Sequence, residues 1–312
     1  MTLIIAGYEI KEDPWSKVWG DMESELGVDG LFAVADSVIT VMGSNGVTPI
    51  LSGLRKIHPV AIKLWKPYFV REEFRDYFEV YLESNCFIAF AGSTLIASHV
   101  LNNITEHLSK LQISYQYGPN SDEPGKYIVQ MHCQENILKS AQNMTWSTEM
   151  FLDRHYDKIL TAEYILDIIE YSINKAISSA RKYQLTPESI KNMHTEFIAG
   201  VHCPATNQHQ LYVYRMDKKL VDGMLEVFVK GEKILENKVA VIGMRKQFED
   251  KAQKHFEDAL NTKVSPGDAL YKFLNKTIDE VSESGSFAID KPSVYTTFKE
   301  GIFKKDIVTR NK

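Results

Sequence analysis

The chain has 312 residues, of which 44% are apolar and 25% charged, and its formal net charge is −5. A chain of this length and composition buries enough surface for a full core in one large domain or two small ones. Its 11% aromatic content argues against a disordered chain, which would lack the apolar surface needed to offset the entropy of ordering. No run of Lys and Arg is long enough to follow a phosphate backbone, which argues against nucleic acid as a partner.

The N-terminus and the cysteines predict the compartment. The first seven residues are apolar, but Glu9 and the charged residues after it end this run, and no basic region precedes it. No apolar run approaches the roughly 20 residues that a membrane span needs. Three widely separated cysteines, Cys86, Cys133 and Cys203, suggest a reducing compartment without a disulfide framework. The sequence therefore predicts a cytosolic protein with no membrane segment.

The first ninety residues are dominated by short apolar runs that predict strands. The predicted strands are residues 2–10, 30–37, 55–62 and 86–91. Residues 11–30 carry charges, Pro14 and two tryptophans, so they predict a long loop or a protruding hairpin. Residues 43–53 contain Asn45-Gly46 and Pro49, which predict a turn rather than a strand.

The hydrophobic period then changes to that of helices. Residues 93–111 and 160–181 carry apolar side chains at helical spacing, and residues 133–150 also suggest a helix, after a loop near 118–125. The remaining predicted elements are strands at 196–201, 210–216, 225–230 and 238–243, helices at 245–261 and 266–282, and a strand at 293–298. Strand runs and helix runs that segregate in this way predict an α+β fold of stacked layers rather than a doubly wound sheet. The simplest packing of these elements places two sheets face to face between two pairs of helices.

Six short motifs follow one another along these elements. They are Thr2-Leu3-Ile4-Ile5-Ala6, residues 30–40 with Ala-Asp-Ser at 35–37, Arg55-Lys56-Ile57, Phe90-Ala91-Gly92-Ser93-Thr94, residues 196–200 followed by 210–212, and residues 239–243. In this order the chain resembles the proteasome β subunits and their bacterial relatives, the HslV/20S type of N-terminal-nucleophile (Ntn) hydrolase. The resemblance implies a four-layer αββα sandwich, formed by a single domain over residues 1–312 with insertions near 11–29, 63–85 and 113–150.

The resemblance also implies a catalytic threonine. Initiator methionine is normally excised before a residue as small as threonine, so removal of Met1 would expose Thr2. A threonine hydroxyl needs a base, and its own α-amine can serve because an α-amino pKa is about 7.7–8.0. Carried over from the family, Lys56 would lie beside the Thr2 hydroxyl and lower its pKa, and Asp36 would pair with Lys56.

Further roles follow from the same resemblance. Gly92 would present its backbone N–H to an oxyanion, and Thr40 and Ser93 would lie along a groove that pairs an extended peptide. Asp279 and Ser282 would be remnants of an Asp-x-x-Ser motif that also belongs to the family's site.

The implied activity is hydrolysis of a peptide or protein substrate by a threonine peptidase, with no cofactor and no metal. Such subunits form homo-oligomeric rings and often depend on an ATPase partner. Two alternatives stay open. Met244 stands where the family has a serine that helps anchor the α-amine, which favours a catalytically inactive scaffold or binding subunit. A small-molecule amidase is the other alternative, and a closed pocket instead of an open groove would distinguish it.

Overall fold

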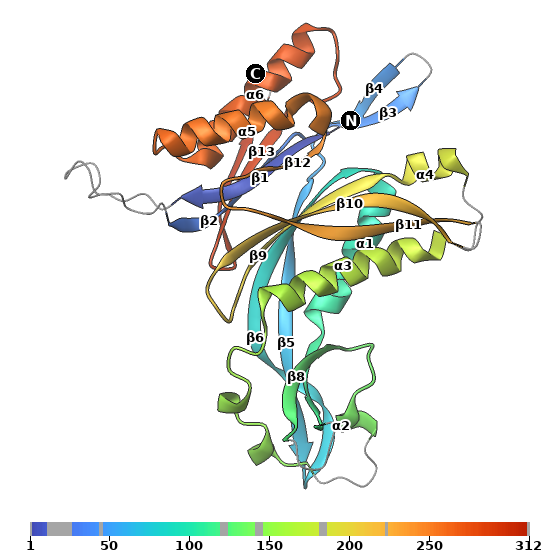
Figure 1. Cartoon of the computed structure of the whole chain (residues 1–312), viewed down its shortest axis with the longest axis vertical. Helices are drawn as coiled ribbons and strands as arrows, with labels where there is room; N and C mark the ends of the chain where they lie inside the picture. The colour runs from blue at the N-terminus through green and yellow to red at the C-terminus, as the bar shows by residue number, and fades with distance from the viewer. Residues whose placement is uncertain are drawn as a thin grey trace, which may run out of the picture.

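The computed structural model describes residues 2–10, 27–43, 46–118, 124–140, 146–180, 186–221 and 224–310. Over these ranges the chain has a mixed α/β fold with a large curled sheet (Figure 1). Met1 and most of the insertion predicted near 11–29 lie outside the described residues.

Two sheets form the centre of the molecule. The five-stranded sheet has the order β12-β1-β2-β13-β14, and the seven-stranded sheet has the order β11-β10-β9-β6-β5-β7-β8. The five strands of the first are β1 (Leu3–Ile10), β2 (Val28–Ala35), β12 (Ala240–Gly243), β13 (Ser293–Lys299) and β14 (Ile302–Thr309). The seven strands of the second are β5 (Ile57–Val70), β6 (Glu73–Gly92), β7 (Leu111–Gln116), β8 (Lys126–Met131), β9 (Thr195–His202), β10 (His209–Val221) and β11 (Met224–Ile234).

The long helices confirm the predictions made from helical spacing. They are α1 (Thr94–Ser109), α3 (Ala162–Ser178), α5 (Arg245–Asn261) and α6 (Pro266–Glu283). Two shorter helices, α2 (Ile137–Ser140) and α4 (Pro187–Met193), and two single turns, η1 (Thr148–Met150) and η2 (Asp153–His155), complete the helical residues. Pro187 and Pro266 stand in the first turns of α4 and α6, where a missing N–H is tolerated, and the caps Thr186 and Ser265 accept hydrogen bonds from the first turn.

Strand β1 shows why the core is divided. Side chains alternate between the faces of a strand, and on β1 both sets are buried. Ile4 and Ala6 belong to a cluster that joins the two sheets, whereas Leu3 and Ile5 pack in a second cluster with α5 and α6. A third cluster lies between the seven-stranded sheet and helices α1 and α3. The continuous apolar run that predicted β1 therefore reflects a strand covered on both faces.

The turn predicted at residues 43–53 was wrong. β3 (Ile39–Gly43) and β4 (Gly46–Leu51) form an antiparallel hairpin separate from both sheets. Pro49 pairs with Thr40 next to an irregularity in the register. Proline is tolerated there because both strands of a two-stranded hairpin are edges, so its missing N–H leaves no partner unsatisfied.

The helix predicted at 133–150 was also wrong in most of the residues described. Only Ile137–Ser140 is α-helical, followed after residue 146 by the single turns η1 and η2. Here Asn136 accepts the N–H of Leu138, and the N–H of Trp146 donates to the carbonyl of Glu72 in the neighbouring hairpin. The first contact caps the start of the short helix α2, and the second ties the backbone of Trp146 to a distant hairpin instead of to a helical carbonyl.

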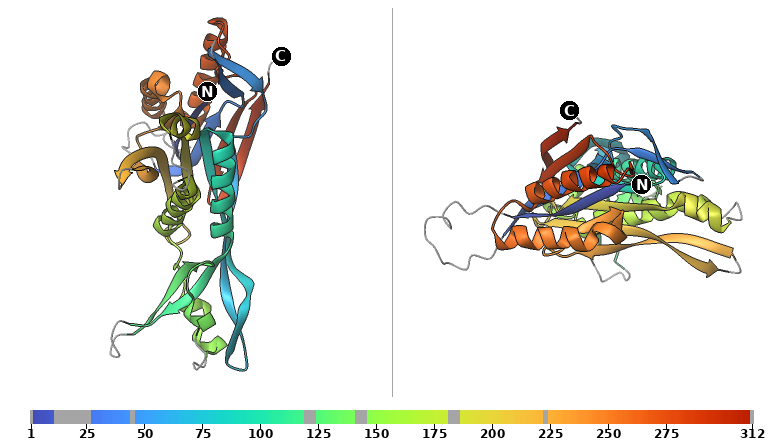
Figure 2. Two further views of the ribbon diagram at one scale, coloured as in Figure 1. Left: turned by 90° about the vertical axis from the view of Figure 1, so that its right-hand side faces the viewer. Right: turned by 90° about the horizontal axis from the view of Figure 1, so that it is seen from above.

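Residues 63–85 continue β5 and β6 far beyond the rest of the sheet, to the lower end of Figure 1. There β7, β8 and the segment 146–160 pack against them, and Figure 2 shows this end narrower than the upper body. We call this region the distal arm, comprising residues 65–82, 111–131 and 146–160. The first residues of β1 lie at the opposite end of the molecule, where the two sheets meet.

Candidate active site

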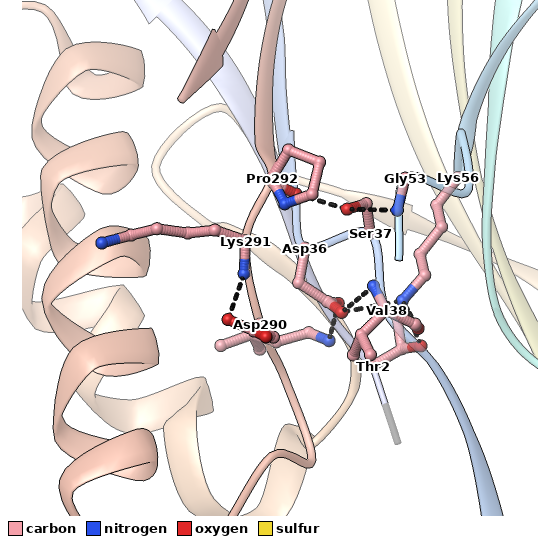
Figure 3. Close-up of polar contacts among 10 residues, drawn as sticks. Thr2, Asp36, Ser37, Val38, Gly53, Lys56, Asp290, Lys291 and Pro292 are labelled. Carbon is pink, nitrogen blue, oxygen red and sulfur yellow. Dashed lines mark hydrogen bonds and ion pairs between the residues drawn. The ribbon is translucent and has the colours of Figure 1, made fainter. Parts of the chain in front are cut away.

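Thr2, Asp36 and Lys56 meet at the junction of the two sheets (Figure 3). The Nζ of Lys56 lies 2.8 Å from the Oγ1 of Thr2 and 2.9 Å from the Oδ2 of Asp36. The side chains of Lys56 and Asp36 are only 2% and 0% exposed. The three residues that the sequence predicted as the catalytic group are therefore in direct contact.

The backbone around Asp36 fixes its carboxylate. Asp36 directly follows β2, and its Oδ1 accepts the N–H of Leu3 at 2.8 Å while its Oδ2 accepts the N–H of Val38 at 3.1 Å. The N–H of Asp36 donates in turn to the carbonyl of Leu3. The carboxylate thus ties the start of β1 to the end of β2 and also holds the lysine.

Lys56 comes from the other sheet. It directly precedes β5, and its carbonyl accepts the N–H of Phe90 in β6. Its Nζ has a third partner, the carbonyl of Val38 at 2.8 Å, so three oxygens surround it. A charged ammonium has three donors, and a neutral amine has two donors and one acceptor, so either form satisfies these contacts.

Burial and charge act in opposite directions on this pair. Loss of water lowers the pKa of Lys56 and raises that of Asp36, while each partner's charge and hydrogen bonds oppose the shift. The pKa of Lys56 is consequently below its ordinary value, which brings the amine closer to proton transfer at neutral pH.

The start of α5 holds the main chain of Thr2. The carbonyl of Thr2 accepts the N–H of Met244 at 2.8 Å. Gly243 has φ +86°, and a Cβ there would lie 1.9 Å from the Thr2 carbonyl oxygen, so glycine is required on both counts. Glu196 of β9 accepts the N–H of Gly243 at 2.8 Å. Met244 thus holds Thr2 through its backbone.

These residues line an open pocket of about 710 Å³. The predicted groove residues Gly92, Thr40 and Ser93 all line it, together with Thr2 and Lys56. Gly92 has φ +123°, and a Cβ there would lie 2.2 Å from the carbonyl oxygen of His194. Five of the predicted residues therefore line one cavity, and the sixth, Asp36, is not part of its lining but contacts Lys56.

Asp279 and Ser282 are not among the residues that line the pocket, and their prediction as site residues is not supported by their position. Both lie in α6, where Asp279 is exposed and forms an ion pair with Lys291 at 2.6 Å. The segment that does reach the site is 290–292, because Ser37 donates a hydrogen bond to the carbonyl of Pro292 (Figure 3).

Sequence reasoning missed Glu196, Arg215 and Lys191, which line the pocket, and gave no role to Ser37, which does not line it but follows Asp36. Ser37 bridges Pro292 and the N–H of Gly53, and its place after Asp36 was the available signal. Glu196 is a nearly buried acid at the start of a largely apolar strand, and acids are rarely buried without a specific partner. Arg215 and Lys191 reach the pocket only through tertiary packing.

Within the described ranges, no group of three or more His, Cys, Asp or Glu side chains is arranged to hold a metal ion. In the same ranges no helix combines the length and the apolar character that crossing a membrane would need.

No family model and no curated protein matches the chain. Among solved structures it is similar to the helical assembly of the Anbu complex from Pseudomonas aeruginosa, with 9% identity and a TM-score of 0.44, covering 99% of this chain and 87% of that one. It is also similar to Anbu (ancestral β-subunit) from Yersinia bercovieri, with 8% identity and a TM-score of 0.43, covering 99% of this chain and 87% of that one.

These matches correct the assignment made from sequence. The HslV/20S type was wrong, because the two similar structures named above are Anbu complexes, a proteasome-like but distinct family, and no family model or curated protein confirms the other type. A likeness at this level of identity says nothing about chemistry. The function of this chain must be argued from its own site.

Proposed function

We propose that this protein is a proteasome-like amidohydrolase that cleaves peptide bonds with Thr2 as its N-terminal nucleophile, after removal of Met1. The observation that carries this proposal is the 2.8 Å contact between Lys56 Nζ and Thr2 Oγ1, made by a lysine that is itself buried against Asp36. A lysine without a functional reason would keep its ammonium in water, because burying a charge is costly even when it is paired.

The first half of the reaction forms an ester. The Thr2 hydroxyl oxygen attacks the carbonyl carbon of the substrate amide, and its proton passes to the free α-amine of Thr2. The oxyanion that forms would be stabilised by the N–H of Gly92, a type of contact worth about 10²–10³ in rate in a well-studied protease. The C–N bond then breaks, and the proton leaves with the amine product.

The second half of the reaction regenerates the free enzyme. The α-amine takes a proton from a water molecule, whose oxygen attacks the ester carbon, and the Thr2 hydroxyl leaves with the proton. Lys56 contacts the reacting oxygen in both halves. As an ammonium it lowers the pKa of the hydroxyl, and the α-amine is then the base. In its neutral form, which its lowered pKa makes more accessible, it would accept the proton in place of the α-amine.

The shape of the pocket favours a peptide over a small molecule. Lys191, Lys246 and Gln247 line it and are exposed, so its rim opens to solvent. The hairpin β3–β4 contributes Ile39, Thr40 and Val47 to one side. An open cavity with an edge strand beside it suits an extended chain that adds as a further strand.

We further propose that the layers form the four-layer αββα sandwich expected from sequence. Three core clusters support this: one joins the two sheets, one lies between the five-stranded sheet and α5 and α6, and one lies between the seven-stranded sheet and α1 and α3.

The test is the mass and N-terminal residue of the purified protein, before and after treatment with a threonine-directed electrophile such as an epoxyketone. We expect loss of Met1 and one covalent adduct, which is absent from Thr2→Ala. Thr161→Ala is a matched control, since this threonine caps α3 away from the pocket and should not affect the adduct. A free Thr2 that never reacts would contradict the proposal.

A catalytically silent scaffold subunit is the second candidate. Its supporting observation is Met244, which gives the Thr2 main chain one backbone N–H but caps α5 with no side-chain hydrogen bond. Retention of Met1 would favour this candidate, because a blocked Thr2 has no free amine to act as base.

The predicted homo-oligomer and ATPase partner stay predictions. The Anbu complex from Pseudomonas aeruginosa is a helical assembly, which is a property of that protein. Light scattering on the purified chain, with and without added copies of candidate ATPases, would test both.

A further inference from the structure

The pocket wall carries an excess of positive charge. Besides Lys56, which is paired with Asp36, four cationic side chains line the cavity, and Glu196 is the only carboxylate among its described lining residues. The four are Lys191, Arg215, Arg245 and Lys246.

The two arginines are already compensated. Arg215 forms an ion pair with Glu232 at 2.7 Å and lies 3.8 Å from both Glu196 and Glu249. Arg245 lies 3.6 Å from Glu249, one turn along the same helix. Glu196, for its part, also accepts the N–H of Gly243. None of these carboxylates is left to neutralise a further cation.

The two lysines are different. Lys191 in the last turn of α4 and Lys246 in the first turn of α5 are both exposed, and neither has an ion-pair partner among the residues that the structure describes. Glu188, three residues before Lys191, and Asp250, four residues after Lys246, make no ion pair with them in the same ranges. Glu249, three residues after Lys246, pairs with the two arginines instead. A lysine at the beginning of a helix opposes the helix dipole, so Lys246 does not serve the stability of α5.

We propose that these two lysines select acidic peptides, binding a carboxylate of the substrate inside the pocket that contains Thr2. The inference rests on the proposed function for the cleavage of the peptide, whereas the binding of the carboxylate does not depend on that function. The two lysines come from different helices and line an open cavity without a counter-charge, and a substrate carboxylate would supply that counter-charge. The carboxylate can come from a Glu or Asp side chain or from the C-terminus of a short peptide.

The experiment measures binding without turnover. Fluorescein-labelled peptides are titrated into the Thr2→Ala variant, in four matched forms: Glu or its isostere Gln within the sequence, each with a free or an amidated C-terminus. We expect the Glu peptide to bind about tenfold more tightly than the Gln peptide at low salt, with the difference shrinking at high salt. A gain confined to the free C-terminus would assign the carboxylate to the peptide end.

The double variant Lys191→Glu/Lys246→Glu, made in the Thr2→Ala background, should bind the four peptides equally or reverse the preference. Lys254→Glu/Lys272→Glu is the matched control, because both lysines are exposed on α5 and α6 and neither lines the pocket. The control should keep the full preference. Circular dichroism of both variants shows whether they fold, and the salt dependence of the parent protein tests the proposal independently of either.

Equal binding of all four peptides, whether or not they carry a carboxylate, or binding of none of them, would overturn the inference. The outcome is separable from that of the proposed function. Selective binding without a Thr2 adduct would mean an acidic-peptide binding site that is not an enzyme, and an adduct without selectivity would leave an enzyme of another preference.

Discussion

The site and the aromatic cluster of the distal arm are both buried, but they are held together by different forces. At the site, the oxygens of Asp36 and the nitrogen of Lys56 all have partners at 2.8–3.1 Å. In the distal arm, rings pack against rings: Phe151 lies 5.2 Å from Phe69 and 5.3 Å from Tyr127 between centroids. The indole N–H of Trp146 in the same cluster is buried, and no hydrogen-bond partner for it lies among the residues that the structure describes.

These two kinds of contact have different consequences for the geometry of the site and for the stability of the fold. Hydrogen bonds and ion pairs are directional and lose most of their value when one partner is removed, because the other is left buried and unsatisfied. Ring packing is nearly non-directional and depends on the area buried. We therefore expect changes at the site to abolish reactivity, and changes in the distal arm to reduce stability while leaving the Thr2 contact intact.

Lys56→Ala should have the largest effect. It leaves Asp36 buried without its counter-ion, which typically costs about 3–5 kcal/mol, and it removes the contact to the Thr2 hydroxyl, so labelling should be lost. Urea unfolding and adduct mass measure the two effects. Lys63→Ala, in the strand β5 that follows Lys56, is the control, because its ion pair with Glu83 is partly exposed to solvent and should be worth about 0–1 kcal/mol.

Phe151→Ala should destabilise the protein by a similar amount, about 3–5 kcal/mol, through the cavity it creates in the distal arm. At a temperature where the variant is folded, however, Thr2 should react with the electrophile at the parent rate. A loss of labelling in the folded variant would break the comparison, since it would show that the arm sets the geometry of the site.

Gly243→Ala should have an intermediate effect. Its Cβ would meet the Thr2 carbonyl oxygen at 1.9 Å, in addition to the roughly 1–2 kcal/mol that an L-residue needs at positive φ. We expect the unfolding free energy to fall by about 2–4 kcal/mol and labelling to slow strongly. Gly285→Ala has the same backbone penalty, at φ +78°, in open space, so it should label normally.

Glu9→Gln should have the smallest effect, and a pH-dependent one. Burial raises the pKa of Glu9 from 4.5 to about 7, so the folded state holds its proton more tightly than the unfolded state does. The free energy of unfolding should therefore fall as pH rises from about 4.5 to 7, and the variant should lack this component.

By pH 8 Glu9→Gln should be more stable relative to the parent than at pH 4, by roughly 1–3 kcal/mol. Urea unfolding across this pH range is the measurement. Parallel profiles for the two proteins would mean that the carboxylate stays charged at the start of α6, where Gly267 donates to it.

The long helices were predictable because their signal is local. The predicted helix at 245–261 coincides with α5, since its apolar residues recur at the spacing that buries one face. The prediction at 43–53 failed because residues 46–51 pair with the neighbouring strand β3. The prediction at 133–150 failed where contact with a distant segment outweighed local preference, as in the bond from Trp146 to Glu72.

The site was predictable in part. The order of the short motifs pointed to Thr2, Asp36 and Lys56 even though the family assignment drawn from them was wrong. Their contact needs two sheets to meet, with Asp36 at the end of one and Lys56 at the start of a strand in the other. Asp279 and Ser282 matched a pattern of letters, but the side chain of Asp279 is exposed and pairs with Lys291.

The sequence by itself determined the kinds of elements, their order and the chemical types of the residues at the site, because propensity, hydrophobic period and turn chemistry act over a few neighbouring residues. Only the tertiary structure decided which charges are paired. Glu196, Arg215, Lys191 and Lys246 are separated by up to 55 residues along the chain, yet they line one pocket. Charge compensation depends on distances of a few ångströms across separate elements, and packing alone sets these distances.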